Sequence, residues 1–467
     1  MTASPAPGPA VDPVLRQTLS QAIELYARGE AVRARADLEA LAGRWPGSPE
    51  LPMAIGTLLH QAGHAGEAEA WYRRCLAAPL LDAGLRDAAR TQLAAAVQVQ
   101  GRLGEAETLW SELLASRPDD ADALRNLGTL LKDRDEPARA LDCYRRATAL
   151  RRRRLRPDEV TALAANPQAR RTTRHKLKLE LEQLEYLAER RIPVPDLAAL
   201  LASYRAVLAE LEATPGDHRV VLTPEQFRRV GATLHRLAHD APAPRQPGGV
   251  LSPGLDFGAI EARYLSHPPG LVVVDRFLRP EALEALRDYC LESTIWFDWG
   301  KARGYCGAYL DDGFGCDLLL QLAEELRAAM PTLLGPLHLE HQWAYIYDQA
   351  LSGITAHADP AKVNLNFWLT PDEANLEPES GGLVVWTREA PREWDFDEYN
   401  NRPDDIEAFA ATSDKVVVPH RRNRLVMFNS NLVHKTDDFR FSPGFTNRRI
   451  NVTMLFGRRS GRTTATH

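Results

Sequence analysis

The chain has 467 residues, 44% of them hydrophobic, and a formal net charge of −6. This length is enough for two or three separate cores, and this charge does not by itself call for a nucleic-acid partner. No apolar run is as long as a membrane span, and the first residues lack the basic start and apolar core of a signal peptide, so we expect a cytoplasmic protein with no membrane partner. The five cysteines are scattered without paired spacing, which predicts reduced thiols rather than disulfides or a zinc site.

The first part of the chain contains a repeat. After residues 1–14, a proline- and alanine-rich tail that we expect to be disordered, small residues, an aromatic residue and a proline recur with a period of about 34 residues. The clearest copy has Gly128, Ala140 and Tyr144. This spacing resembles tetratricopeptide repeats over residues 15–154, an all-α array whose stacked helix pairs form a concave groove. The resemblance implies that the groove holds a peptide or partner protein; packing against the rest of the chain, or dimerisation, is the alternative.

Residues 155–240 predict a helical connector, in which two helices flank a turn at Pro193 and Pro195. A run rich in arginine and lysine, residues 145–178, overlaps its start. Basic runs can bind phosphate, but no aromatic residues are interleaved with this one, so we interpret it as a solvated helix face near an acidic neighbour and do not expect nucleic acid as a partner. The proline- and glycine-rich residues 241–254 predict a linker.

Beyond the linker the pattern changes from helical to strand-like, over residues 255–460, before a short tail at 461–467. Two amphipathic helices precede a series of short segments rich in valine, leucine and aromatic residues. These segments are LHLEHQWAYIYD, KVNLNFWLT, GGLVVW, KVVVP, RLVMFN and RRINVTMLF. The order predicts an antiparallel sandwich or barrel backed by helices, and we favour a jelly-roll barrel.

A candidate metal site lies in this region. His357 and Asp359 are two residues apart, so on an extended strand both side chains project to the same side. A nitrogen from His434 would complete a set of two imidazoles and one carboxylate, which suits Fe(II) because it leaves neighbouring coordination positions open. His338 and Glu340 make a second match to the same short pattern. We favour the later pair, because it lies between two predicted strands and is followed by a distal histidine.

Residues 255–460 resemble the 2-oxoglutarate- and iron(II)-dependent oxygenases of the prolyl-hydroxylase-like group. The opening VVVDRFLRPEALEAL, the His-x-Asp pair, the later histidine and a basic residue on the last strand appear in the order found in that family. The resemblance implies a double-stranded β-helix (jelly-roll) with iron at His357, Asp359 and His434. It also implies 2-oxoglutarate and dioxygen as co-substrates, release of succinate and hydroxylation of a C–H bond.

The family uses a Lys or Arg of the last strand to bind the far carboxylate of 2-oxoglutarate, and this chain offers two candidates. Arg449 shares its strand face with Asn451 and Thr453, whereas Arg448 shares its face with apolar residues. A pocket that buries a carboxylate needs a planar donor fork with polar neighbours, so we favour Arg449 and keep Arg448 as the alternative.

Two further residues are candidates for the co-substrate pocket. Tyr347 resembles a phenol that hydrogen-bonds 2-oxoglutarate in related enzymes, with Tyr345 as the alternative of the same strand parity. Asn364 and Asn366 alternate with apolar residues. We expect at least one of them to point into the polar pocket and favour Asn366.

Two segments are expected to choose the substrate. Residues 304–316, glycine-rich with Tyr305 and Tyr309, predict a flexible loop, and residues 387–414 combine aromatic with acidic side chains. Acids beside aromatics favour a cationic peptide or amine, and a solvated acidic lid is the alternative. The sequence therefore predicts a hydroxylase acting on a peptide or protein recruited by the repeats. The alternatives are the same chemistry on a small biosynthetic molecule and a non-catalytic repeat scaffold.

Overall fold

The computed structural model describes residues 28–44, 49–79, 81–212, 219–300, 304–348 and 353–459, together with residues 17, 20–22, 24 and 25. The predicted tails, residues 1–14 and 461–467, lie outside the described residues. The chain divides into two compact units, Met1–Leu130 and Leu131–Thr466. Each unit is described by itself, and the domain boundaries predicted from the sequence stay a prediction.

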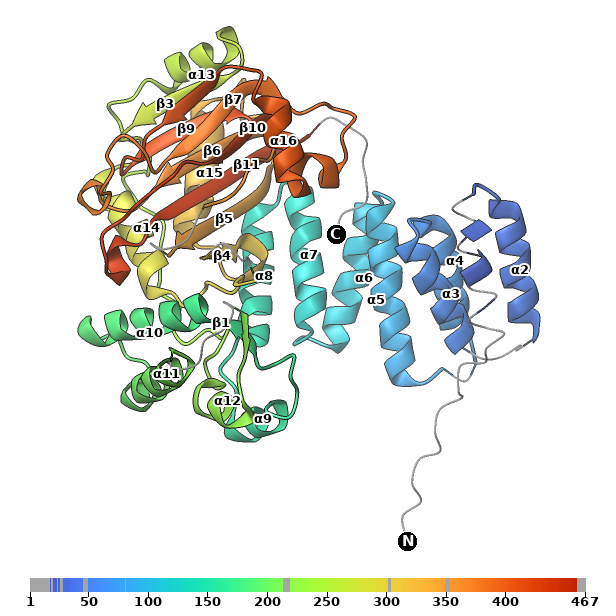
Figure 1. The fold of residues 1–467 in the computed structure, drawn as a ribbon. Helices are drawn as coiled ribbons and strands as arrows, with labels where there is room; N and C mark the ends of the chain where they lie inside the picture. The colour runs from blue at the N-terminus through green and yellow to red at the C-terminus, as the bar shows by residue number, and fades with distance from the viewer. Residues whose placement is uncertain are drawn as a thin grey trace. The chain divides into compact units, whose positions relative to one another are not determined.

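The first unit is helical and confirms a tetratricopeptide-like N-terminal region. Its helices are α2 (Ala31–Arg44), α3 (Glu50–Gln61), α4 (Ala65–Leu76), α5 (Ala83–Val99), α6 (Leu103–Ser116) and most of α7 (Ala121–Asp133) (Figure 1). Small residues let neighbouring helices touch: a Cβ atom on Gly56 would lie 2.6 Å from the ring of Tyr72. Ala68 and Ala106 are fully buried for the same reason.

The second unit begins with the end of α7 and a mainly helical segment. The elements of this segment are α8 (Pro137–Arg151), α9 (Pro157–Leu163), β1 (Arg171–Thr173), α10 (Arg174–Glu189), α11 (Leu197–Glu212), β2 (Arg219–Val221) and α12 (Pro224–Val230). Helices α10 and α11 pack as a hairpin around buried residues that include Leu184 and Tyr204. Residues 241–254 form no regular helix, but backbone hydrogen bonds hold them to the rest of the unit. For example, the backbone N–H of Leu318 donates to the carbonyl oxygen of Ala243.

The basic run lies beside acidic side chains, as interpreted from the sequence. Arg145 lies 3.0 Å from a carboxylate oxygen of Asp317, and Arg152 forms an ion pair with Asp312. Both acids belong to the sheet-rich part of the same unit. The acids that neutralise these arginines are far away in sequence, so the local pattern could not identify which acids they are.

The rest of the second unit is rich in β-sheet, as predicted. Its helices are α13 (Phe257–Ser266), α14 (Pro280–Glu292), α15 (Asp317–Ala329) and α16 (Pro403–Ala410), with the 3-10 turns η1 (Leu310–Asp312), η2 (Asp372–Ala374) and η4 (Phe445–Asn447) and the π-helical turn η3 (Asp397–Asn401). Its strands are β3 (Leu271–Asp275), β4 (Tyr305–Tyr309), β5 (Leu339–Tyr347), β6 (Ala361–Trp368), β7 (Leu383–Glu389), β8 (Lys415–Val418), β9 (Arg424–Asn429), β10 (Leu432–Thr436) and β11 (Ile450–Arg458).

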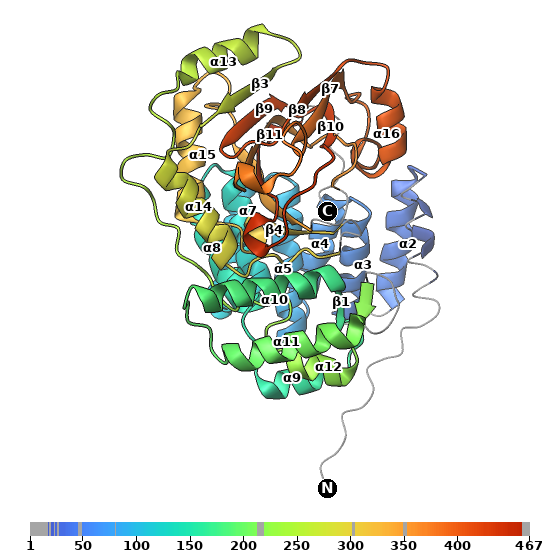
Figure 2. The same ribbon diagram turned by 60° about the vertical axis from the view of Figure 1, so that its left-hand side comes forward.

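These strands make two antiparallel sheets. One has six strands in the order β3-β9-β6-β11-β5-β4 and the other has three in the order β10-β7-β8. Strands β3 to β11 therefore form two separate sheets, and the described residues contain no closed barrel. Helices α14 and α15 lie on one side of the strands and α16 on the other (Figure 2).

Side chains on the large sheet alternate between an apolar face and a polar face. On β6 and β11, Leu365 and Val452 join the large apolar core that also contains residues of α14 and α15. Asn366, Asn451 and Thr453 alternate with them and are buried on the opposite face. Buried polar side chains need partners, so this face is where a polar site can be built.

Residues 304–316 are not the flexible loop that their glycines predict. Strand β4 occupies Tyr305–Tyr309 and pairs with β5, with Gly307 opposite Tyr345. A Cβ atom at Gly307 would lie 2.9 Å from the ring of Tyr345, so this glycine makes room for a neighbour rather than supplying flexibility.

The five cysteines are free and buried. None of the helices in the described ranges has the length and apolar character needed to cross a membrane.

Candidate active site

The structure brings His357, Asp359 and His434 together. The two histidines face each other across an antiparallel bridge, in which His357 N–H donates to His434 O at 3.0 Å and His434 N–H donates back at 2.8 Å. One potential ligand atom from each of the three residues lies within 4.8 Å of the other two. The carboxylate oxygens of Asp359 are 3.7 Å from Nε2 of His357 and 3.4 Å from Nε2 of His434.

Backbone carbonyls set the protonation of both imidazoles. Nδ1 of His357 lies 2.8 Å from Thr355 O, and Nδ1 of His434 lies 3.0 Å from Leu432 O. A carbonyl oxygen can only accept, so each Nδ1 carries a hydrogen, and in the neutral form of each ring the lone pair lies on Nε2. Those lone pairs belong to the nitrogens nearest Asp359, which is how metal-binding histidines are commonly oriented.

Asp359 is buried and ionised. Burial alone would raise its pKa, but His434 and His357, which bond or attract the carboxylate when they are protonated, outweigh burial and hold the pKa below its ordinary value. Asn364 donates its side-chain amide to the carboxylate at 2.5 Å, and Asn366 donates to Asn364 in turn. Two neutral imidazoles and one buried carboxylate form a compact anionic set, and these donors fit a divalent cation such as Fe(II).

A cavity of about 400 Å³ adjoins this set. The six site residues that we favour from the sequence all line it, namely His357, Asp359, His434, Arg449, Tyr347 and Asn366. Tyr345, the alternative to Tyr347, lines it as well. Asn364, the alternative to Asn366, is bonded to Asp359 instead of forming the cavity wall.

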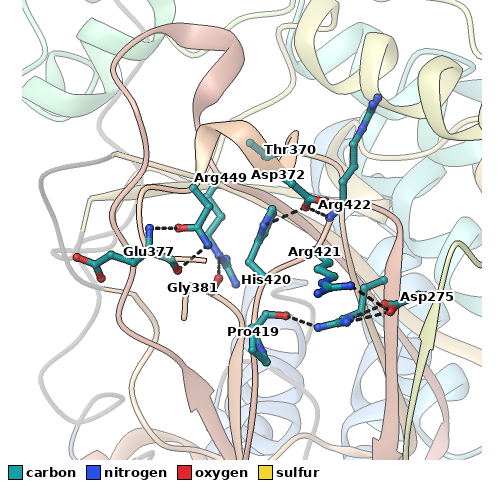
Figure 3. Close-up of polar contacts among 12 residues, drawn as sticks. Asp275, Thr370, Asp372, Glu377, Gly381, Pro419, His420, Arg421, Arg422 and Arg449 are labelled. Carbon is teal, nitrogen blue, oxygen red and sulfur yellow. Dashed lines mark hydrogen bonds and ion pairs between the residues drawn. The ribbon is translucent and has the colours of Figure 1, made fainter. Parts of the chain in front are cut away.

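Arg449 is a buried cation without a carboxylate partner among the described residues. It is 1% exposed, and its guanidinium donates to Gly381 O at 2.7 Å, Gly382 O at 3.1 Å and Asn451 Oδ1 at 3.3 Å. Figure 3 shows Arg449 turned toward the loop at Gly381. Burial lowers the pKa of Arg449, and Tyr347 and the more distant Asp437 only partly oppose this effect. An anionic ligand would compensate the buried charge.

Arg448 points to other partners. Its Nε donates to Glu182 on α10 at 2.7 Å, and its guanidinium lies 3.7 Å from Asp348. It does not line the cavity. The two neighbouring arginines thus differ, as their positions on opposite strand faces suggest. Arg448 contacts carboxylates of the chain, whereas Arg449 has only neutral acceptors within hydrogen-bond distance.

The pair His338 and Glu340 serves a different purpose. Glu340 bonds Lys132 at 3.2 Å and Arg458 at 3.2 Å, and Nε2 of His338 is 3.8 Å from Asp135. These contacts join the end of α7 to strands β5 and β11. His338 and Glu340 therefore match the His-x-acid pattern but make ion-pair contacts between elements of the fold.

Residues of the 387–414 segment take part in the site in a way that the sequence did not reveal. Within the turn η3, Tyr399 O accepts the N–H of Ala358 at 2.8 Å, and the Asn400 amide donates to Ala358 O at 3.2 Å. Ala358 lies between the two candidate ligands, so η3 holds their backbone from both sides. Phe396, Asn400 and Asn401 also line the cavity. A π-helical turn beside a functional site is a recurrent feature, but nothing in the local sequence marked it.

The acids of this segment are partly neutralised within the chain. Asp397 pairs with Arg402 at 3.0 Å, and Glu407 pairs with Lys435 at 2.6 Å. They therefore offer less free negative charge to a substrate than the sequence suggests.

Comparisons with known proteins address the two parts of the chain separately. A tetratrico peptide repeat family model matches residues 52–158. A part of the chain resembles a prolyl-4-hydroxylase of Pseudomonas putida, with 20% identity over 44% of this chain and 100% of that one, and a TM-score of 0.30.

Two further solved structures show likenesses of similar strength. One is SnoN, a non-heme alpha ketoglutarate dependent epimerase from nogalamycin biosynthesis, with 16% identity, coverage of 43% and 83%, and a TM-score of 0.32. The other is PilF of Pseudomonas aeruginosa, with 18% identity, coverage of 33% and 68%, and a TM-score of 0.23. No curated protein matches the chain. At TM-scores this low, no likeness assigns a substrate or a cofactor to this protein.

Proposed function

We propose that this protein is an Fe(II)- and 2-oxoglutarate-dependent dioxygenase that hydroxylates a side chain of a peptide or protein recruited by its tetratricopeptide repeats. The observation that carries the proposal is the cavity that joins His357, Asp359 and His434 to Arg449. Iron with 2-oxoglutarate and dioxygen supplies the oxidation, in which one oxygen atom enters a C–H bond and the other enters succinate as carbon dioxide leaves.

The residues of the chain supply binding and orientation. His357 and His434 would hold iron through Nε2 and Asp359 through its carboxylate, while Thr355, Leu432 and Asn364 keep these donors oriented. This set leaves open positions on the metal for a chelating 2-oxo acid and for dioxygen.

Arg449 would bind the far carboxylate of 2-oxoglutarate. Its planar fork suits a carboxylate, and the phenol of Tyr347 lies close, with the Arg449 Cζ 4.7 Å from the centre of the Tyr347 ring. Asn366, which accepts from Thr453 Oγ1 at 2.7 Å, would complete the polar end of the pocket.

The fold proposed for this part is a double-stranded β-helix. Its support is two antiparallel sheets of six and three strands, with candidate ligands contributed by β10 and by the segment before β6. The bridge between His357 and His434 sits where these two segments meet.

The activity is tested with full-length protein, Fe(II), 2-oxoglutarate, dioxygen and a peptide library. We expect succinate formation that depends on a peptide and a sixteen-dalton gain on that peptide. Asp359→Ala should lose both signals. Succinate formation stimulated only by small metabolites would instead support the alternative substrate class, and no succinate under any condition would refute the proposed activity.

Recruitment by the repeats needs a test that leaves the second unit intact. Removing residues 1–154 would take away α8, whose Arg145 pairs with Asp317, so lost activity would not distinguish recruitment from misfolding. Comparing a substrate protein with a short peptide around its modified residue avoids this problem. Recruitment predicts a KM for the whole protein at least tenfold below that for the peptide, and equal KM values would contradict it.

A further inference from the structure

The candidate active-site cavity has one wall built almost entirely of aromatic rings. Tyr305 and Tyr309 on β4 and Trp343 and Tyr345 on β5 form this aromatic wall, and all four line the cavity. The pairing of β4 with β5 sets Tyr309 opposite Trp343 and Gly307 opposite Tyr345. Because residues two apart on a strand face the same way, these four rings share one face of the strand pair.

The rings are close enough to act as one surface. The ring centres of Tyr305 and Tyr345 are 4.9 Å apart, those of Tyr309 and Tyr345 are 6.2 Å apart, and those of Trp343 and Tyr345 are 6.3 Å apart. Tyr309 and Trp343 are only partly buried. Aromatic faces carry partial negative charge, so a grouped set of faces attracts a cation more strongly than a single ring.

The carboxylate of Asp298 is hydrogen-bonded to one residue of this wall, Tyr309. The Tyr309 hydroxyl donates to Asp298 Oδ2 at 2.8 Å and lies 3.1 Å from the Tyr345 hydroxyl. Asp298 is held by two backbone hydrogen bonds with Gly307, at 3.0 and 2.7 Å. A phenol that donates to a carboxylate becomes more electron-rich, and the carboxylate adds its own negative potential.

Positive charge is scarce on this side of the cavity. Among the described residues that line it, Arg449 is the only lysine or arginine. Arg449 is fixed to the Gly381–Gly382 backbone and belongs to the proposed co-substrate end. A cationic side chain near the aromatic wall would therefore contact electron-rich rings, with the Asp298 carboxylate bonded to Tyr309 behind them, whereas an anionic side chain would be repelled.

We propose that the aromatic wall, with Asp298 acting through its bond to Tyr309, binds the positively charged side chain of a lysyl or arginyl residue of the substrate. This inference rests on the proposed function for the identity of the cavity as a substrate site, and it adds the chemical class of the substrate. A neutral flat ring or a prolyl residue would also stack on aromatic faces, but its binding would not depend on Asp298. The dependence on Asp298 is therefore the property to measure.

The experiment titrates full-length protein with three blocked amino-acid amides and follows binding by ligand-observed NMR. The probes are N-acetyl-lysine amide, its uncharged counterpart N-acetyl-norleucine amide, and N-acetyl-glutamate amide. We expect the lysine probe to bind about tenfold or more tightly than the norleucine probe, as contacts of a cation with several rings generally allow. The glutamate probe should be the weakest of the three.

Two variants and one control test whether the aromatic wall causes the preference for the lysine probe. Asp298→Asn keeps the size of the side chain and an acceptor for Tyr309 but removes the charge, so the preference for lysine should fall about tenfold toward unity. Tyr309→Phe keeps the ring and loses the bond to Asp298, and should reduce the preference in part. Tyr186→Phe, which removes a phenol away from the cavity, is the matched control and should leave it unchanged.

The inference is overturned if norleucine or glutamate binds as tightly as lysine, if no probe binds, or if the preference survives in folded Asp298→Asn protein. Thermal unfolding of each variant shows whether it is folded. The readout is binding rather than turnover. Failure of this test therefore leaves the proposed metal chemistry standing, and failure to bind iron would not alter the result obtained here.

Discussion

Replacing Arg449 should weaken 2-oxoglutarate binding far more than replacing its neighbour Arg448. Arg449 is 1% exposed and donates to two backbone carbonyls and the oxygen of Asn451, all of them neutral acceptors. Removing one partner of a buried, hydrogen-bonded charge pair generally costs about 2–5 kcal/mol. Taking about 3 kcal/mol for Arg449→Gln, the Kd for 2-oxoglutarate should rise roughly a hundredfold.

The control exploits the adjacent residue. Arg448→Gln removes a buried arginine of the same strand region and with it the ion pairs to Glu182 and Asp348. It should lower the free energy of unfolding while keeping the 2-oxoglutarate Kd within about threefold of wild type. Both affinities can be measured by titration calorimetry with Fe(II) under anaerobic conditions. Unchanged binding by Arg449→Gln, or a large loss in Arg448→Gln alone, would refute the assignment of the carboxylate-binding residue.

Three further predictions concern neighbouring residues. Asn364→Ala removes the amide that donates to Asp359, so metal affinity measured by titration should fall about 10–100-fold, and unchanged affinity would contradict this role. Gly382→Ala would place a Cβ atom 1.9 Å from Val418 O, so its melting temperature should drop by several degrees; a wild-type melting curve would refute this contact. His420, which lies beside Arg449 in Figure 3, has its pKa lowered to about 3, mainly by burial and then by Arg449 and Arg424. Because an unfolded histidine titrates near 6.5, the unfolded state takes up the proton first, and stability that is present above pH 6.5 is lost as the pH falls. His420 alone should account for a loss of about 1.5 kcal/mol between pH 6.5 and 5, and denaturant unfolding of His420→Leu should show a correspondingly flatter pH dependence.

Much of the candidate site could be anticipated because strand alternation is a local property. Residues two apart on an extended strand share a face, so Arg449 could be grouped with Asn451 before any fold was known. The same rule grouped His357 with Asp359, although the structure places this pair just before β6 and not within a strand. The helical repeats were predictable for a similar reason, since the small residues recur at a fixed period. The metal and co-substrate roles of these residues remain predictions.

The rest depended on contacts between distant segments. Gly307 looks like a source of flexibility until the ring of Tyr345 is placed against it. Arg448 could be separated from Arg449 by parity, but its partner Glu182 lies in a helix that precedes the sheets. The hydrogen bonds of Tyr399 and Asn400 to the backbone of Ala358 likewise depend on the position of η3, which no local sequence pattern predicts.

Iron binding by His357, Asp359 and His434 is the central claim, and anaerobic metal binding tests it most directly. Purified full-length protein should retain a single equivalent of Fe(II) and develop a weak visible charge-transfer band when 2-oxoglutarate is added. His357→Ala should lose both the metal and the band while remaining folded. A wild-type protein that binds no Fe(II), or a His357→Ala protein that keeps both signals, would contradict the assignment of this site.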